Sequence, residues 1–289
     1  MSYNIQNIDL TMLCMYYRDV LTDTNYEPFL NIQCGADAAG VQLDMHGDNT
    51  GDNISYDNCY WSEITGIYWA WKNLELTGYV GLCSYRRFFN FKNSTRPIEL
   101  INTDNAPGLI KDSFDTQRIS EILSEHDVIL PIAYNYPWSI RRVCSKNYKD
   151  EDFLILENYI AQNHPSYLED YKHIMYKSNS MVGHNMFVMR AELFSEYCEW
   201  VFDILLGIRT KVNPENYPIH QVRVFGYMHE LLLPTFIRKK QLKVFSSQLM
   251  WVNDNVSKFR FNNPLYRYTS ELIYQFSKLL GSKYPHIVK

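Results

Sequence analysis

The sequence predicts an α/β protein with one main sheet. Short apolar runs alternate with helical patterns along the chain, as expected when helices cover a sheet. With 289 residues, the chain is long enough to bury one full core. The clearest strand candidate, residues 79–83, runs directly into a group of polar side chains. Because ligands of α/β proteins bind at such strand ends, we expect the functional site there.

Composition excludes several classes of function. The formal net charge is −4, whereas nucleic-acid-binding proteins carry a basic excess. The six cysteines contain no Cys-x-x-Cys pair, which predicts reduced thiols and no zinc site. Residues 1–10 lack the pattern of a signal peptide, and no apolar run is long enough to span a membrane. We therefore expect a cytoplasmic protein with no nucleic-acid partner.

The elements are expected in the following order. Strands are predicted at 10–17, 29–34, 79–83, 127–131, 182–189 and 242–245. Helices are predicted at 60–76, 116–124, 150–162, 165–176, 191–208 and 219–240, the last bent at Pro234. Residues 91–114 are rich in Asn, Asp, Thr and Pro, which predicts a long surface loop or lid. This order indicates a main domain of residues 1–250 and a tail of residues 251–289.

The tail combines positive charge with an apolar stripe. Between residues 257 and 289 the only acid is Glu271, and the basic residues are Lys258, Arg260, Arg267, Lys278, Lys283 and Lys289. At helical spacing the tail carries Leu265, Tyr268, Leu272, Ile273, Phe276, Leu279 and Leu280. Such a basic amphipathic helix can lie on an anionic membrane, pack on its own domain or form a homodimer.

Two adjacent arginines follow the strand at 79–83. Ser84 and Tyr85 lead into Arg86 and Arg87, and no Asp-x-Asp pair stands there to bind a metal. Guanidinium groups bind an anion such as a diphosphate bidentately and without a metal. Alternatively, one arginine pairs with a structural acid while the other is solvated, and the residues alone support both interpretations equally.

A polar loop at residues 44–53 offers a second set of candidate ligands. Its spacing of Asp44, Asp48 and Asp52 resembles a calcium loop only superficially, because the later Glu ligand is missing. Asp52 and Asn53 are expected to contact ribose or sugar hydroxyl groups, and a metal site on the three aspartates is the competing interpretation.

Small and polar residues nearby add weaker signals. Gly35 after the second strand either lets a ligand approach the backbone or forms a plain tight turn. Glu63, Gly66, Ala70 and Asn73 form a narrow helical arc, which predicts close packing against either a backbone or a ligand.

Six stretches together resemble a known family. Residues 47–55, 63–73 and 79–89 resemble the core of a bacterial capsule and exopolysaccharide biosynthesis family, and residues 185–189, 196–200 and 223–232 fit it as well. That family was long catalogued only as a domain of unknown function, and its characterised members are galactofuranosyltransferases. The resemblance covers about residues 9–245. It departs at Ser84, where the family usually has His, and at 229–231, where His-Glu-Leu replaces Ser-Glu-Arg.

The resemblance implies a GT-A-like fold, with a Rossmann-type sheet, flanking helices and a helical C-terminal appendage. It also implies a glycosyltransferase that moves a sugar, such as galactofuranose, from a UDP-sugar to a surface-polysaccharide or lipid-linked glycan acceptor with inversion. The expected donor contacts are Gly35, Asp52, Asn53, Glu63, Lys72, Asn73, Ser84, Arg86 and Arg87, and the expected acceptor contacts are His184, Asn185 and His229. We expect Glu230 to be the general base, with Asp203 and Asp52 as further candidates.

Neither a metal nor another cofactor is expected. Two alternatives remain open at this point. One is a non-catalytic glycan- or nucleotide-binding subunit of a polysaccharide synthase, which hydrolysis of the donor without acceptor would distinguish. The other is a metal-dependent transferase that uses Asp44, Asp48 and Asp52, which turnover in EDTA would distinguish.

Overall fold

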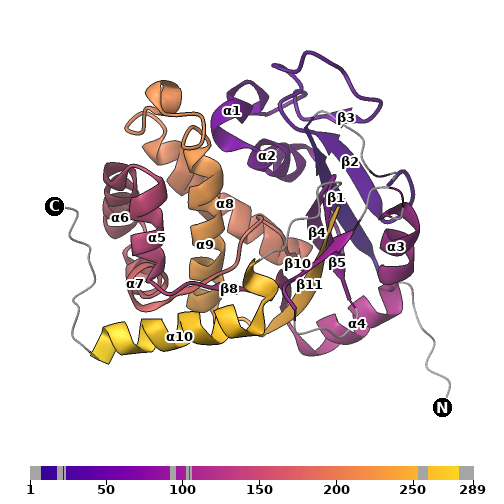
Figure 1. Ribbon diagram of the computed structural model, residues 1–289. Coiled ribbons are helices and arrows are strands. Elements are labelled where there is room, and N and C mark those ends of the chain that lie inside the picture. Colours follow the sequence, from indigo (N-terminus) through magenta and orange to yellow (C-terminus); the bar gives the residue numbers. More distant parts are fainter. Residues whose placement is uncertain are drawn as a thin grey trace.

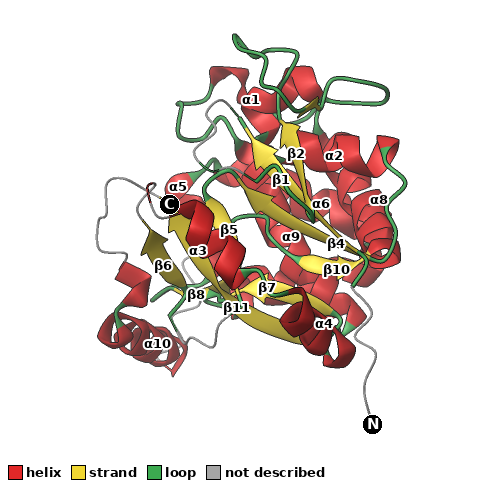
Figure 2. Ribbon diagram, turned by 90° about the vertical axis from the view of Figure 1, so that its right-hand side faces the viewer, coloured by secondary structure: helices red, strands yellow, loops and turns green. Residues whose placement is uncertain are grey.

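The computed structural model describes residues 8–17, 22, 24–91, 96–101, 104, 106–252 and 260–279. Within these residues the chain forms one large mixed sheet with helices packed against it (Figures 1 and 2). The predicted α/β class with one main sheet is therefore confirmed.

The described sheet has nine strands in the order β10-β7-β11-β5-β4-β1-β2-β3, with β6 beside β11. Their bounds are β1 Leu10–Tyr16, β2 Phe29–Gln33, β3 His46–Gly47, β4 Tyr79–Ser84, β5 Arg87–Asn90, β6 Ile98–Ile101, β7 Val128–Pro131, β10 Val188–Arg190 and β11 Val244–Val252. Strand β1 is parallel to both β2 and β4, so the carboxyl ends of all three lie at one edge. Antiparallel β5 follows β4 after a tight turn, with Ser84 opposite Arg87.

The α-helices are α1 Asn58–Trp61, α2 Ile64–Asn73, α3 Ala106–Ser113, α4 Thr116–Glu125, α5 Ile140–Asn147, α6 Asp150–Asn163, α7 Leu168–Lys177, α8 Ala191–Ile208, α9 Val224–Lys240 and α10 Pro264–Leu279. A separate two-stranded ribbon pairs β8 Tyr134–Asn135 with β9 Ser180–Met181. Helices α2 and α5–α9 lie on one side of the sheet, and α3 and α4 lie on the other (Figure 1).

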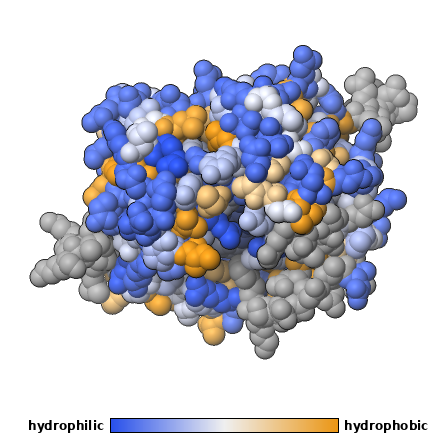
Figure 3. Space-filling model, turned by 90° about the horizontal axis from the view of Figure 1, so that it is seen from above, coloured by the Kyte–Doolittle hydropathy of each residue, from blue (hydrophilic) through white to orange (hydrophobic). Residues whose placement is uncertain are grey.

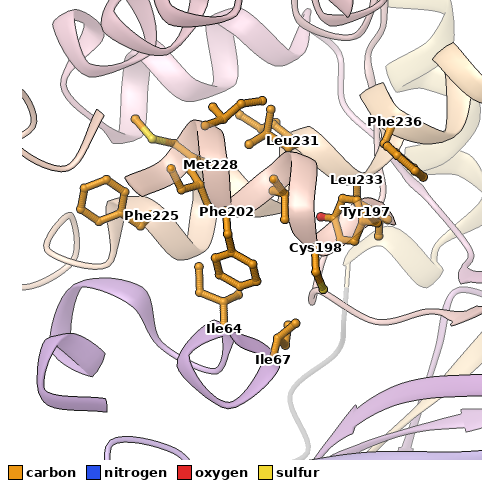
Figure 4. Close-up of a cluster of buried hydrophobic side chains, with 14 of the residues drawn as sticks. Ile64, Ile67, Tyr197, Cys198, Phe202, Phe225, Met228, Leu231, Leu233 and Phe236 are labelled. Atoms are coloured by element: carbon orange, nitrogen blue, oxygen red, sulfur yellow. The ribbon is translucent and has the colours of Figure 1, made fainter. Parts of the chain in front are cut away.

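A buried apolar cluster holds α9 against α2 and α8. Ile64 and Ile67 of α2 face Phe202 of α8 and Met228 of α9 (Figure 4). The narrow arc of α2 packs on the sheet, because a Cβ at Gly66 would lie 2.7 Å from the sulfur atoms of Met15 and Cys34. Close packing against the sheet thus explains why residue 66 is glycine. The apolar cluster in turn fixes the position of α9.

Several expected boundaries differ from the structure. The helix expected at 60–76 is interrupted at Ser62, whose φ is 57°, and ends at Asn73. The expected loop 91–114 contains β6 and α3, because Ile98–Ile101 pairs with the end of β11. Only 188–189 of the expected strand 182–189 belongs to a strand, and α9 begins at Val224 and continues through Pro234.

The C-terminal part of the chain is joined to the main sheet. Strand β11 extends to Val252, so the expected boundary at residue 250 falls inside it. Helix α10 packs through Ser270 and Tyr274, which are buried, and Asn179 donates a hydrogen bond to Glu271 (3.0 Å). The opposite face exposes Leu265, Tyr268, Leu272, Ile273 and Phe276. The side chains of Lys278 and Leu279, and all of residues 280–289, lie outside the described part of the chain.

Candidate functional site

The candidate site is a cleft of two adjoining lobes. The first, called the sheet lobe, has a volume of about 370 Å³ and lies at the carboxyl ends of β1, β2 and β4. The second, called the helix lobe, has a volume of about 460 Å³ and lies between the β4–β5 turn, α5 and α9. Both lobes are lined by Ser62, Glu63, Arg86, Arg87 and Arg223. Seen from above, the surface of the molecule is hollowed near its centre (Figure 3).

Three guanidinium groups mark the junction of the lobes. Arg86 lies in the β4–β5 turn, Arg87 begins β5, and Arg223 immediately precedes α9. The Nε of Arg86 is buried without a hydrogen-bond partner in the described residues. Within that part of the chain, neither Arg86 nor Arg87 forms an ion pair with a carboxylate. This concentration of positive charge favours an anionic ligand at the junction.

Arg87 is held in place by neutral groups. Its Nε donates to the Ser84 hydroxyl (3.2 Å), and its Nη1 donates to Nδ1 of His184 (2.7 Å). Because a guanidinium has no acceptor, Nδ1 of His184 accepts, and the opposite ring nitrogen carries the hydrogen and donates to the Tyr134 hydroxyl. Burial and the two neighbouring arginines lower the pKa of His184 well below its usual value. His184 is therefore neutral and leaves the charge of Arg87 uncompensated.

Glu230 is the carboxylate with the most perturbed titration in the cleft. It projects from α9 into the helix lobe, and its Oε1 accepts a hydrogen bond from the main-chain N–H of His184 (2.9 Å). Burial, followed by repulsion from Glu63, raises the pKa of Glu230 to about 7, against the opposing effects of that hydrogen bond and of Arg87. A carboxylate that titrates near neutral pH is suited to take a proton from a bound hydroxyl group.

Comparison with known proteins decides the family. Residues 11–241 match the family described as a domain of unknown function (DUF4422). The chain belongs to this family.

A solved structure described as the apo form of WbbM, a bifunctional glycosyltransferase, is 26% identical, with a TM-score of 0.72. The similarity covers 89% of this chain and 47% of that one, so this chain spans less than half the length of the solved protein. This chain thus shares its fold with part of that glycosyltransferase. The comparison with curated proteins gave no match. None of the described helices is both long and apolar enough to cross a membrane.

In this DUF4422 chain, a buried hydrogen-bond chain lies behind the cleft. Asn185 donates to Glu63 Oε1 (3.1 Å) and accepts from Nδ1 of His229 (2.8 Å). The other ring nitrogen of His229 accepts from Tyr197 (3.2 Å), and burial lowers the pKa of His229 to about 3. Asn185 and Glu63 line the helix lobe, whereas His229 does not. His229 therefore orients Asn185 and Glu63 rather than contacting a ligand in the cleft.

The aspartates of the polar loop lie outside the cleft. Asp48 is completely buried and accepts from the main-chain N–H groups of Gly35 (2.9 Å) and Ala36 (3.0 Å) and from the Ser55 hydroxyl. Asp44 and Asp52 are exposed. In the described chain no group of three His, Cys, Asp or Glu side chains is placed to hold a metal ion. The metal site considered for Asp44, Asp48 and Asp52 is therefore wrong, because Asp48 is a buried structural acceptor.

Other expected donor contacts bind groups of the protein itself. The side chain of Asn73 bonds both main-chain groups of Asp52, and Tyr68 donates to the Asp52 carboxylate (3.0 Å). Asn53 caps a local turn through Gly51 and Ser55. Lys72 lies over the Trp71 ring at 3.7 Å. Gly35 has a φ of 72° and packs against Asn58, which fits the tight-turn alternative. None of the residues Gly35, Asp52, Asn53, Lys72 and Asn73 lines either lobe.

Asp203, the further candidate for the general base, lies on the outer face of α8. Its side chain is 56% exposed and accepts from His164 (2.8 Å). It lines neither lobe, so its position does not suit it to act on a ligand of the cleft.

The structure adds site residues that the sequence did not single out. Arg223 lies at the start of the last quoted family stretch, which is the one sequence signal that could have suggested a role; its place directly before α9 is shown by the structure, because the predicted helix began at residue 219. Arg260 comes from the tail, and the aromatic wall of the helix lobe consists of Tyr134, Tyr136, Tyr148 and Tyr227. The expected residues that do meet in the cleft are Glu63, Ser84, Arg86, Arg87, His184, Asn185 and Glu230.

Proposed function

We propose that this protein is a glycosyltransferase that moves a sugar from a UDP-sugar to a glycan acceptor. The observation that carries this proposal is the group of three arginines between the two lobes, with the Arg86 Nε buried and unpaired. The donor diphosphate would bind at this junction, with the nucleoside in the sheet lobe and the sugar and acceptor in the helix lobe. The fold shared with a bifunctional glycosyltransferase supports the same assignment.

The arginines supply the charge that a departing diphosphate needs. At roughly 4 Å and an effective dielectric constant near 20, one guanidinium contact is worth about 4 kcal/mol before desolvation. Arg87 is already oriented by Ser84 and His184, so little reorganisation accompanies binding. We therefore infer that these side chains stabilise the leaving group without a metal ion.

Glu230 takes the role of general base in an inverting transfer. Such a reaction needs one group that accepts the proton of the attacking hydroxyl while the sugar-phosphate bond breaks. Glu230 lies in the helix lobe with a pKa of about 7, and a Cβ added at Gly183 would lie 3.7 Å from its Oε2, so the glycine leaves space beside this oxygen. The carboxylate is therefore available to a hydroxyl group of an acceptor in that lobe.

Donor and acceptor follow from the family resemblance. UDP-galactofuranose is the proposed donor, and a surface polysaccharide or its lipid-linked precursor is the proposed acceptor. Peripheral contact with the cytoplasmic face of a membrane would bring the enzyme to a lipid-linked acceptor. The exposed stripe of α10, in a segment whose only acid is already bonded to Asn179 and Gln275, would make this contact.

The arginine assignment is tested by UDP binding. Arg86→Ala and Arg87→Ala should each weaken UDP affinity roughly tenfold or more, because each removes a charge-assisted contact. Arg190→Ala is the matched control, since Arg190 is exposed and lies over Tyr79, outside both lobes. Calorimetry with UDP measures the affinities, and circular dichroism confirms the fold.

Two further measurements complete the test. Hydrolysis of the UDP-sugar without acceptor should be detectable, and turnover should persist in excess EDTA. Unchanged UDP affinity in both variants would refute the diphosphate site. UDP binding without any hydrolysis or transfer would instead identify a non-catalytic binding subunit, and loss of turnover in EDTA that manganese restores would refute the metal-independent mechanism.

A further inference from the structure

A short helical turn from the C-terminal segment reaches the helix lobe. The 3-10 helix Arg260–Asn262 lies just before α10, and Arg260 lines the lobe. Phe261 is buried and stacks on Tyr134, with ring centroids 4.9 Å apart. Asn262 exchanges hydrogen bonds with the main chain of Ile98 in β6 (3.0 and 2.5 Å). The contacts of Phe261 and Asn262 therefore fix the turn that carries Arg260 against the domain. Arg260 itself lies beyond the matched residues 11–241.

The guanidinium of Arg260 is a separate centre of positive charge. It lies over the rings of Phe261 (4.9 Å) and Tyr266 (5.7 Å), and in the described residues it forms no ion pair with a carboxylate. Burial raises the pKa of Tyr136 to about 12, and the nearby charge of Arg260 opposes this shift, whereas the cation that opposes the raised pKa of Glu230 is Arg87. Arg260 thus lies in the helix lobe near Tyr136, and it does not line the sheet lobe as the three arginines of the junction do.

We propose that Arg260 binds an anionic group, a phosphate or a carboxylate, carried by the acceptor glycan. This inference rests on the proposed function, in which the helix lobe holds the acceptor. The arginines of the junction are assigned to the donor diphosphate. Arg260 is then the remaining cation that lines the helix lobe in the described residues, and the donor supplies no anion for it. A guanidinium fork suits both phosphate and carboxylate oxygens.

The aromatic wall beside Arg260 suits the rest of such an acceptor. Tyr136 is packed edge-on against Phe261, and Tyr148 lies 4.5 Å from Tyr227 between ring centroids. Flat apolar rings with a polar edge offer a surface for the face of a sugar ring. An acceptor sugar on this wall would place an attached anionic group near Arg260 and a hydroxyl group towards Glu230. Arg260 is accordingly a specificity-determining residue rather than a catalytic one.

The test compares matched probes in the presence of saturating UDP, which occupies the junction. The probes are methyl β-galactoside (neutral), galactose 1-phosphate (phosphate) and methyl galacturonide (carboxylate), and titration followed by protein NMR measures each affinity. The wild type should bind at least one anionic probe roughly tenfold more tightly than the neutral probe. Arg260→Gln should remove this preference without changing UDP affinity, and Arg190→Gln should retain it. The phosphate and carboxylate arms identify the source of the anion.

The outcomes separate this inference from the proposed function. Equal affinity for neutral and anionic probes, absence of binding by every anionic probe, or a preference that survives in Arg260→Gln overturns the acceptor-anion site. Failure of the wild type to bind UDP instead overturns the proposed donor site, which the Arg260 variant leaves intact.

Discussion

The polar loop of residues 44–53 and the turn of residues 84–87 both follow strands at the same edge of the sheet, yet only the turn lines the cleft. In the loop, the carboxylate of Asp48 is saturated by two main-chain N–H groups and a hydroxyl. In the turn, Arg86 has a buried Nε without a described partner, and Arg87 is bonded to neutral groups. The loop uses the Asp48 carboxylate to bind the backbone that follows β2, and the turn leaves charge for a ligand.

This difference shows why a high density of polar residues is a poor guide to a site. A buried polar group needs a partner, and the protein itself supplies it for Asp48. Where the fold leaves charge without a compensating partner beside a cavity, a ligand can supply one. The same distinction predicts that substitutions in the two regions have different effects, on chemistry in the cleft and on stability in the loop.

The largest expected effect is on chemistry at Glu230. Glu230→Gln keeps the shape of the side chain and removes its basicity, so kcat should fall by a factor of about 10² to 10⁴ while UDP affinity is retained. The wild-type rate should rise with pH through about 7, because the base acts when it is deprotonated. Steady-state transfer kinetics across pH 5.5–8.5 measure both effects. Wild-type kcat in the variant would assign the proton transfer to another group.

Stability of the same variant gives an independent check. The pKa of Glu230 is raised on folding, so the native state disfavours the ionised form. Below the unfolded-state pKa, Glu230 is protonated in both states and does not reduce the free energy of unfolding. As the pH rises from there through about 7, the unfolded state ionises more readily than the native state, so the free energy of unfolding falls. Glu230→Gln should therefore gain stability relative to the wild type at pH 8, and the difference should vanish near pH 4. Urea unfolding at the two pH values measures it, and a pH-independent difference would contradict the raised pKa.

The next effect is on the stability of the loop. Asp48→Ala leaves the N–H groups of Gly35 and Ala36 and the Ser55 hydroxyl without an acceptor, so the free energy of unfolding should fall by about 3 kcal/mol or more. The matched control is Asp52→Ala, which is exposed and loses the bond from Tyr68, with an expected cost of about 1 kcal/mol or less. Urea unfolding of the two variants gives the comparison. Equal stabilities, or a loss of kcat in folded Asp52→Ala, would break the contrast between loop and turn.

Local patterns were sufficient for much of the fold. Helix α8 was predicted at 191–208 and has those bounds. Its apolar residues recur at helical spacing, a pattern that depends on the segment alone. The strand β6 and helix α3 were missed, since Ile98–Ile101 is held by pairing with Leu249–Val252, far away in the chain. The break at Ser62, whose φ is 57°, was also missed, since the residue type does not favour this backbone; in the structure Asn58 donates to the Ser62 carbonyl, and Gly226 of α9 lies beside the Ser62 side chain.

The site was predictable where its residues are adjacent in sequence or carry a family motif. Arg86 and Arg87 follow a clear strand, and Glu230 lies in a quoted family stretch. Asp52 and Asp203 have the same chemistry as Glu230 but face outwards, and only the positions of α2 and α8 decide this. Arg260 was assigned to a tail, because its contact with the helix lobe depends on the packing of Phe261 against Tyr134.

The smallest expected effect concerns the two faces of α10, which repeat the contrast between satisfied and available surfaces. Ser270 and Tyr274 pack on the domain, whereas Leu272 and Phe276 are 49% and 61% exposed. If the exposed face lies on an anionic membrane, the protein should float weakly with phosphatidylglycerol-containing liposomes and be released by high salt. Leu272→Ser with Phe276→Ser should reduce the floating fraction a few-fold without changing UDP affinity. Leu154→Ser, an exposed leucine of α6, is the matched control. If all three proteins float equally, or none floats, α10 does not bind the bilayer. A concentration-dependent dimer that is lost in the double variant would instead identify a second copy of the chain as the partner of the exposed face.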